Sequence, residues 1–100
     1  MAEVSWTPQA LDDLDAVCLF IARDAPRYAE LFAARVFQAS GRVGEFPYSG
    51  RVVPEIGRDD IREVIVQNYR LIYRVQADEV EILAVHHGAR LVGEFGPDAS

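Results

Sequence analysis

Two glutamates and two histidines are the side chains of this sequence best suited to acid–base chemistry on a phosphodiester. Cleavage of RNA at a 2′-hydroxyl needs a general base, a general acid and cations around the phosphate. Glu55 or Glu63 could supply the base and His86 or His87 the acid, with arginines as the clamp. The ten basic residues are all arginine, so any such clamp would consist of arginines.

Arginines on the predicted strands offer a second kind of chemistry, the binding of anions. Arg70 and Arg74 lie four residues apart on one strand and therefore share a face, and we expect Arg62 beside them on the neighbouring strand. Arg51 and Arg90 flank the same strands, so a convergent cluster would suit a carboxylate-rich peptide. The alternative is that these arginines form ion pairs across the strand ladder. The acids available for such pairs are Glu63, Glu81 and Asp78.

We expect neither a metal site nor a cofactor. His86 and His87 are adjacent, so on a strand they face opposite sides of the sheet and cannot hold one metal together. Cys18 is the only cysteine, which excludes an internal disulfide and a cysteine-rich zinc site. It falls at an apolar helical spacing and is interpreted as a small buried hydrophobe.

Length and charge limit the classes of protein to which the chain can belong. Its 100 residues suit a single domain over residues 1–100, with a core of about residues 3–90. The net charge of −6 argues against nonspecific or direct nucleic-acid binding. Acidic residues or arginines interrupt every apolar run, so no membrane span is predicted. The residues from Met1 to Trp6 lack the pattern of a secretory signal, and a cytoplasmic location is expected.

The first half of the sequence predicts a short strand followed by two helices. Glu3 to Trp6 is the strand, Thr7 is the expected N-cap of the first helix, and Pro8 is its first residue. Pro26 opens the second helix, which ends before Phe46. Apolar stripes at helical spacing predict an antiparallel hairpin whose two helices face a common partner. The stripes are Leu11, Leu14, Cys18 and Ile21 in the first helix, and Ala29, Phe32, Val36, Ala39 and Val43 in the second.

The second half changes to the two-residue period of strands. Ile61 to Val66, Tyr69 to Gln76 and Glu79 to His86 are three strand signals joined by two-residue turns. Strict alternation would place Val80, Ile82 and Ala84 on one face of the last strand. The predicted fold class is α+β, with an N-terminal strand, an antiparallel helical hairpin and a three-stranded antiparallel meander (β-α-α-β-β-β).

Several segments, taken in order, resemble the RelE/ParE family of bacterial type II toxins, and the ParE branch is the closer match. The likeness covers residues 4 to 90 and agrees with the predicted order of elements. The segments that carry it are Trp6-Thr7-Pro8-Gln9-Ala10 with Asp13-Leu14, Phe46-Pro47-Tyr48-Ser49-Gly50-Arg51 with Val53-Pro54-Glu55, Ile61-Arg62-Glu63-Val64-Ile65-Val66, Tyr69-Arg70-Leu71-Ile72-Tyr73-Arg74-Val75, and Ile82-Leu83-Ala84-Val85 with His87-Gly88 and Arg90.

The resemblance implies a growth-inhibiting toxin that binds DNA gyrase rather than one that performs chemistry, and it implies a role in plasmid stabilisation. A cognate ParD-like antitoxin would neutralise it in a hetero-oligomeric complex. The alternatives are a RelE-like endoribonuclease acting on mRNA at the ribosome, and a degenerate member that binds its antitoxin without being toxic. The suspected catalytic positions of one nuclease group fall on Val64 and Ala89, which cannot do that work, so no catalytic residue is assigned.

Two sets of candidate contact residues follow from this resemblance. Phe20 and Phe37 point away from the stripes of their helices. They are interpreted either as a second buried face inside the hairpin or as apolar surface for a partner. The antitoxin candidates are Leu19, Phe20, Tyr28, Leu31 and Phe37. The target candidates are Arg51, Arg62, Arg70, Arg74, His87 and Arg90.

Overall fold

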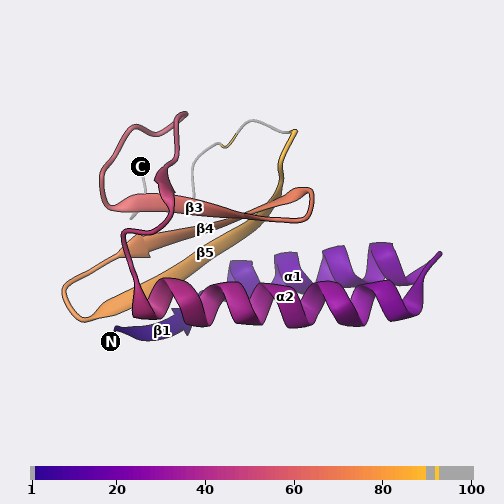
Figure 1. Cartoon of the computed structure of the whole chain (residues 1–100). Helices are drawn as coiled ribbons and strands as arrows, with labels where there is room; N and C mark the ends of the chain where they lie inside the picture. The colour runs from indigo at the N-terminus through magenta and orange to yellow at the C-terminus, as the bar shows by residue number, and fades with distance from the viewer. Residues whose placement is uncertain (1, 90–91, 93–100) are drawn as a thin grey trace.

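The protein is a five-stranded sheet with two helices packed on one of its faces (Figure 1). The computed structural model describes residues 2–89 and 92. The elements follow the order β1 (Glu3–Trp6), α1 (Pro8–Ala22), α2 (Pro26–Glu45), β2 (Arg51–Val52), β3 (Ile61–Val66), β4 (Tyr69–Val75) and β5 (Glu79–His87). The strand order across the sheet is β1-β5-β4-β3-β2. The predicted α+β class and the predicted order of elements are confirmed.

The N-terminal strand and the first helix begin where the sequence predicts. The Thr7 side chain accepts a hydrogen bond of 3.0 Å from the backbone N–H of Ala10, and Pro8 is the first helical residue. Strand β1 pairs in parallel with β5, whereas the other pairs are antiparallel, so the sheet is mixed. A parallel pair needs a long crossover connection, and the helical hairpin lies in the chain between β1 and the meander.

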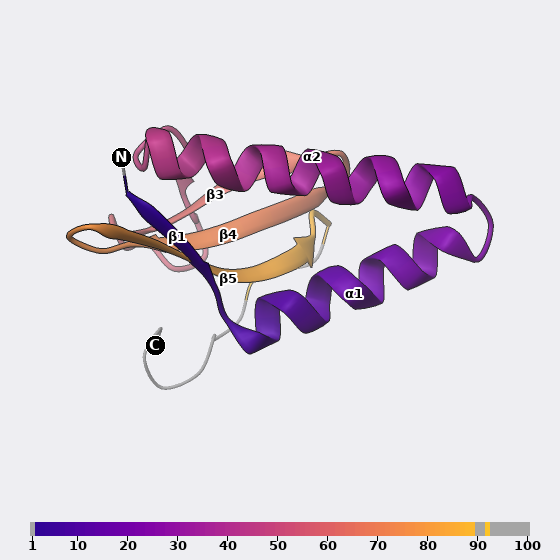
Figure 2. The ribbon, with the colours of Figure 1, turned by 90° about the horizontal axis from the view of Figure 1, so that it is seen from below.

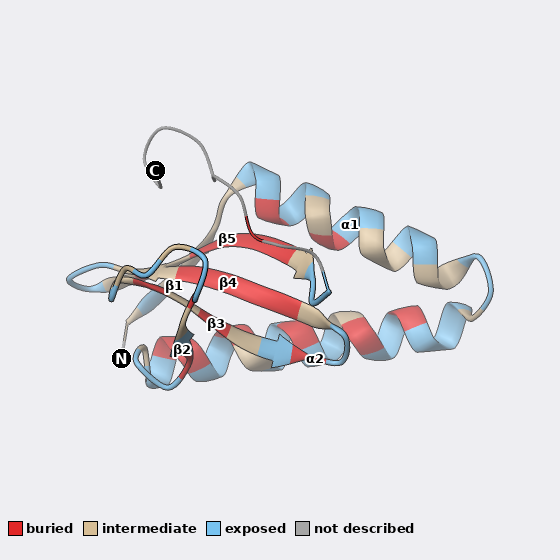
Figure 3. Ribbon diagram, turned by 90° about the horizontal axis from the view of Figure 1, so that it is seen from above, coloured by how far each residue is buried: buried red, intermediate tan, exposed pale blue. Residues whose placement is uncertain are grey.

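The helix-covered face holds the larger apolar core. Both helices turn buried residues toward the sheet, and the two helices diverge from their connected end, with β1 between them (Figures 2 and 3). Leu11 is an exception to the predicted stripe, since it is exposed and Ala10 is buried in its place. The buried members of this core are Ala10, Leu14, Phe32, Val36, Val43, Val66, Leu71, Tyr73, Val80, Ile82 and Val85.

The opposite face of the sheet is covered by irregular segments rather than by helices. The segment between β2 and β3 folds over it, and Val92 packs there after the chain leaves β5. A smaller apolar cluster fills the space beneath, formed by Val53, Ile61, Ile72, Leu83, Ala84 and Val92. We call this the second face of the sheet.

Three details of the sheet differ from the predicted pattern. Strand β2 adds an edge strand where a loop was expected, pairing Arg51 with Glu63. The register between β4 and β5 shifts at Ile72 and Tyr73, which marks a β-bulge. As a result, Ala84 lies in the second-face cluster and Val85 lies in the helix-side core. The bulge breaks the two-residue alternation, which is why the prediction for Ala84 was wrong.

The predicted grouping of three arginines on one face was also wrong. Arg62 pairs in register with Tyr73, a member of the helix-side core, whereas Arg70 pairs with Ile65 and Arg74 with Ile61. Cross-strand partners share a face, so Arg62 lies on the side opposite Arg70 and Arg74. No helix in the described part of the chain is long and apolar enough to cross a membrane.

Candidate functional site

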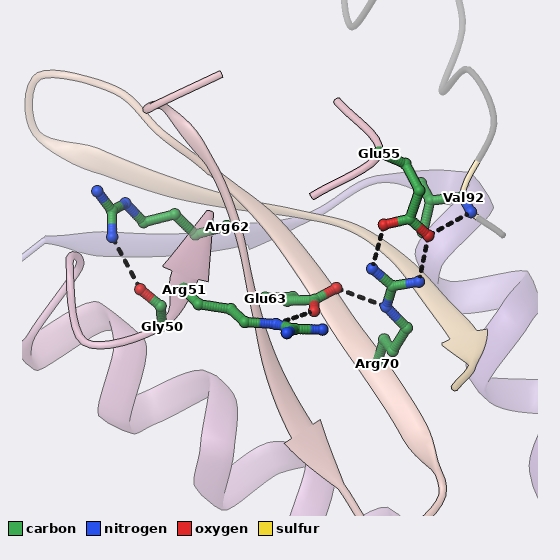
Figure 4. A network of polar contacts seen from close by, with 7 residues as sticks. All are labelled: Gly50, Arg51, Glu55, Arg62, Glu63, Arg70 and Val92. Carbon is green, nitrogen blue, oxygen red and sulfur yellow. Dashed lines mark hydrogen bonds and ion pairs between the residues drawn. The ribbon is translucent and has the colours of Figure 1, made fainter. Parts of the chain in front are cut away.

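A network of buried charges holds the second face together (Figure 4). The Arg70 guanidinium donates from Nε to Glu63 over 2.5 Å, and from Nη1 and Nη2 to the Glu55 carboxylate over 2.6 and 2.8 Å. The Arg70 side chain is 5% exposed and that of Glu63 is 0% exposed. Such a charge is tolerated in the interior only where it is paired and hydrogen-bonded, and both conditions are met here.

Glu55 and Glu63 tie two other segments into this network. Glu55 accepts a 3.0 Å hydrogen bond from the backbone N–H of Val92, which fixes the chain after β5. Glu63 forms a second ion pair, in which Arg51 Nε on β2 donates to Glu63 Oε2 over 2.6 Å. Gly50 precedes Arg51, and a Cβ there would come within 2.5 Å of the Glu63 carbonyl, so only glycine allows this approach. The network therefore joins β2, the loop between β2 and β3, β3, β4 and Val92.

The chemistry of these carboxylates does not suit a general base. Hydrogen bonds from Arg70 lower the pKa of Glu55 from 4.5 to about 2. A useful base has a pKa near the working pH, and both oxygens of Glu55 already accept hydrogen bonds. Glu63 is held between Arg51 and Arg70 without exposure to solvent. Both carboxylates thus act as structural partners of arginines.

Among the predicted target residues, the four described arginines are engaged in different ways. Arg70 and Arg74 form the ladder ion pairs that were the alternative prediction, Arg74 with Glu81 at 2.7 Å. Arg62 donates to the Gly50 carbonyl over 2.8 Å and lies over the Tyr48 ring, 4.8 Å from its centroid. Arg51 keeps a side chain that is 63% exposed despite its pair with Glu63. Arg90 lies outside the described residues.

His87 belongs to an aromatic groove at the connected end of the two helices. Its ring meets the Tyr69 ring edge-on at 5.2 Å, and Tyr69 in turn packs against Phe32. Phe20 and Tyr28 from the two helices line the same groove, which has a volume of about 400 Å³. We call this the aromatic groove. It brings one target candidate and two antitoxin candidates together.

Phe37, another antitoxin candidate, does not form one surface with the aromatic groove. Phe37 packs on Trp6 of β1, with ring centroids 5.5 Å apart. It follows Tyr28 by nine residues on α2, which places the two on opposite sides of a helix with 3.6 residues per turn. All five candidates are exposed: Leu19, Phe20, Tyr28, Leu31 and Phe37. Phe20 and Phe37 are therefore not the second buried face that was the alternative for them.

One feature near α2 was not predicted from the sequence. Arg35 and Arg42 of α2 line a groove of about 520 Å³ beside β3, with Ile65 and Gln67 on its other wall. The signal was present, because two residues seven apart lie on the same side of a helix. Without the tertiary structure, the sequence does not show that α2 lies beside β3.

The comparisons with known proteins identify the family. The model of the ParE toxin of the type II toxin–antitoxin system parDE matches residues 4–92. The chain belongs to this RelE/ParE family of toxins. It is 35% identical over 91 residues to Toxin RelE2 of Caulobacter vibrioides, which covers 91% of this chain and 100% of the relative. It is 37% identical over 87 residues to Putative toxin Y4kP of Sinorhizobium fredii, covering 84% of this chain and 85% of that protein.

A solved structure shares the fold of this family member. The chromosomal ParDE toxin–antitoxin system of P. aeruginosa contains a chain that matches with a TM-score of 0.73 and 20% identity. The match covers 87% of this chain and 96% of that one. The predicted resemblance to the RelE/ParE family is confirmed, together with its fold. RelE and ParE names both occur among these relatives, so the cellular target is a separate question.

Proposed function

We propose that this ParE-family toxin inhibits DNA gyrase by binding it, and that a cognate ParD-like antitoxin neutralises the toxin in a hetero-oligomeric complex in the cytoplasm. The observation that carries the choice of binding over catalysis is the engagement of Glu55 and Glu63. Both candidate bases are held by Arg70, and the pKa of Glu55 is lowered to about 2. A carboxylate of this kind is a poor proton acceptor at neutral pH.

The surface that remains accessible on the second face supports a binding role. Arg51, Ile65 and Gly88 line one groove of about 430 Å³ there. Ile65 also lines an adjoining groove at the end of the sheet, which reaches His87 of the helix-covered face. Ile65 is an exposed apolar side chain, and the Arg51 side chain is 63% exposed. An apolar centre with an arginine at its edge is typical of contacts that contribute strongly to protein binding. We assign target contact to Arg51 and His87.

The aromatic groove is the proposed docking site of the antitoxin. Phe20 and Tyr28 are exposed there next to the buried Phe32, which gives a concave apolar surface between the helices and the sheet. An apolar segment of a partner that orders on binding would cover these rings. Phe37 and Trp6 form a separate apolar contact, which a longer segment would reach only by passing around α2.

The test of the target is a pair of assays on the same purified protein. We expect inhibition of plasmid supercoiling by gyrase, and intact mRNA in a translation extract. Arg51→Gln, shown to be folded by its melting curve, should weaken the inhibition, whereas Arg27→Gln, at an exposed arginine of α2 away from the second face, should leave it unchanged. Position-specific cleavage of mRNA with unaffected supercoiling would contradict the proposal and favour a ribonuclease. Absence of both activities with tight antitoxin binding would indicate a degenerate toxin.

A further inference from the structure

The outer edge of β3 is open beside α2. Strand β2 pairs with β3 only through Arg51 and Val52, which face Glu63 and Arg62. The backbone N–H of Val53 donates to the carbonyl of Ile61, so the backbone groups of Ile61 point toward this outer edge. Hydrogen-bonding directions alternate along a strand, and those of Ile65 therefore point the same way, beyond the end of β2. An open edge of this kind is a template for another strand.

The wall opposite this edge is positively charged. Arg35 and Arg42 from α2 line the groove of about 520 Å³, and Gln38 lies between them. Neither arginine takes part in an ion pair with another described residue. The whole chain carries a net charge of −6, so two arginines without carboxylate partners beside an open strand are a local exception. Charge complementarity therefore favours an acidic occupant.

We infer that this groove binds an extended acidic peptide segment of a partner protein, which adds a strand to the edge of β3. Its backbone pairs with Ile65, and its carboxylates meet Arg35 and Arg42. Seven residues of α2 separate these arginines by about 10 Å along the helix axis. Alternate residues of a strand are about 7 Å apart, and every fourth residue about 13 Å, so acids at such spacings reach both arginines.

The composition of the groove favours a peptide over a nucleic acid. Its described lining contains the aliphatic Ala39, Val43, Val64 and Val66, and no aromatic ring on which a base would stack. The Ile65 side chain is 60% exposed on the other face of the same strand, where an apolar residue of the added strand would cover it. The inferred segment therefore alternates acidic residues toward α2 with apolar residues toward the second face.

This inference does not depend on gyrase as the target, because Arg35 and Arg42 lie apart from Arg51 and His87 and the test uses a peptide alone, although Ile65 is common to both surfaces. The probe is a seven-residue peptide of alternating glutamate and valine with blocked ends, titrated by calorimetry. The Arg35→Glu/Arg42→Glu double variant should lower the affinity about tenfold or more. The matched control is Arg23→Glu/Arg27→Glu, which makes the same change of charge outside the groove and should leave the affinity unchanged. Melting curves should show that both variants are folded.

Hydrogen exchange tests the strand addition itself. Bound peptide should slow exchange of the Ile65 amide, and methylation of the central peptide nitrogens should abolish binding. Equal binding of the peptide to the Arg35→Glu/Arg42→Glu variant, or equal binding of a lysine–valine peptide, would overturn the inference. So would binding without protection of Ile65. An RNA oligonucleotide that binds in place of the peptide and depends on the same two arginines would replace the peptide site with a nucleic-acid site.

Discussion

The helix-covered face of the sheet is filled mainly by large apolar side chains such as Phe32, Leu71 and Ile82, whereas the second face combines a smaller apolar cluster with Arg70, Glu63 and Glu55. Helices present a continuous apolar stripe to one face. The loop between β2 and β3 offers only a few apolar residues to the other, such as Val53 and Ile56. The second face therefore depends on ion pairs for part of its cohesion. Its stability is expected to respond to charge and pH in ways that the first face does not.

The largest expected effect comes from removing the centre of the network. Arg70→Ala leaves Glu63 buried against Arg51 alone and Glu55 without its bidentate partner, and should cost about 3–5 kcal/mol of unfolding free energy. Arg74→Ala breaks the more accessible pair with Glu81 and should cost about 1 kcal/mol. Urea unfolding of both variants measures the difference. Equal losses would show that the two ion pairs contribute alike and that the network has no special role.

A double variant sharpens the same comparison. Replacing the pair by Arg70→Met with Glu63→Leu removes both buried charges, and apolar replacements of a buried pair are often neutral or stabilising. At least half of the stability lost in Arg70→Ala should return in urea unfolding. No recovery would mean that the geometry of the hydrogen bonds, and not the unpaired charge, is what the second face requires.

Surface aromatics on the helical side should affect binding rather than folding. Phe20 is 62% exposed, so Phe20→Ala should change the unfolding free energy by less than about 1 kcal/mol. At an interface, loss of a buried ring costs roughly 2 kcal/mol, which is about thirtyfold in antitoxin affinity. Calorimetric titration with the antitoxin and thermal melting measure the two quantities. A loss of several kcal/mol of stability with unchanged affinity would make Phe20 a core residue.

The acid sensitivity of the second face follows from Glu55. Its pKa is lowered from 4.5 to about 2 in the folded protein, mainly by hydrogen bonds from Arg70. A carboxyl whose folded pKa is depressed stabilises the fold above its unfolded pKa, and this contribution is lost as the pH falls from about 4.5 to 2. The melting temperature of the native protein should therefore exceed that of Glu55→Gln at pH 7, and the gap should close across this range. A constant gap would contradict the linkage.

The smallest expected effect lies in the turn between β3 and β4. Gln67 has a positive φ of 57°, a conformation that costs a non-glycine residue about 1 kcal/mol. Gln67→Gly should stabilise the protein by about 0.5 kcal/mol, since the added entropy of the unfolded glycine offsets part of the relief. Asn68→Gly is the matched control, because Asn68 is not among the described residues with positive φ. Stabilisation by both variants would contradict the assignment to Gln67.

The sequence predicted those parts of the fold that depend on local patterns. Thr7 and Pro8 marked the start of α1, and the spacing of Phe32, Val36 and Val43 identified the buried side of α2. The same periodicity turned Phe20 and Phe37 away from the stripes but left open whether they were buried or exposed, and the structure shows them exposed. These features are set within one element, so the residues of that element suffice to predict them.

Features that depend on how elements meet could not be predicted in this way. The bulge at β5 moved Ala84 to the second face, and strand register placed Arg62 away from Arg70. Glu55 and Glu63 had suggested acid–base chemistry, but their role depends on Arg70, which reaches both only in the folded sheet. Arg35 and Arg42 gained significance only when α2 was placed beside β3.

Growth inhibition by Glu55→Gln tests most directly the claim that the second-face carboxylates support the fold and take no part in catalysis. The substitution keeps the size of the side chain and removes its capacity to act as a base. The variant is to be expressed at the same soluble level as the native toxin and tested below its own melting temperature. We predict that it inhibits growth within about threefold of the native toxin. Loss of the charge-assisted hydrogen bonds between Glu55 and Arg70 should cost about 1–2 kcal/mol of unfolding free energy and leave the exposed binding surface in place. Complete loss of growth inhibition by a folded Glu55→Gln protein would contradict the account and make Glu55 a catalytic base.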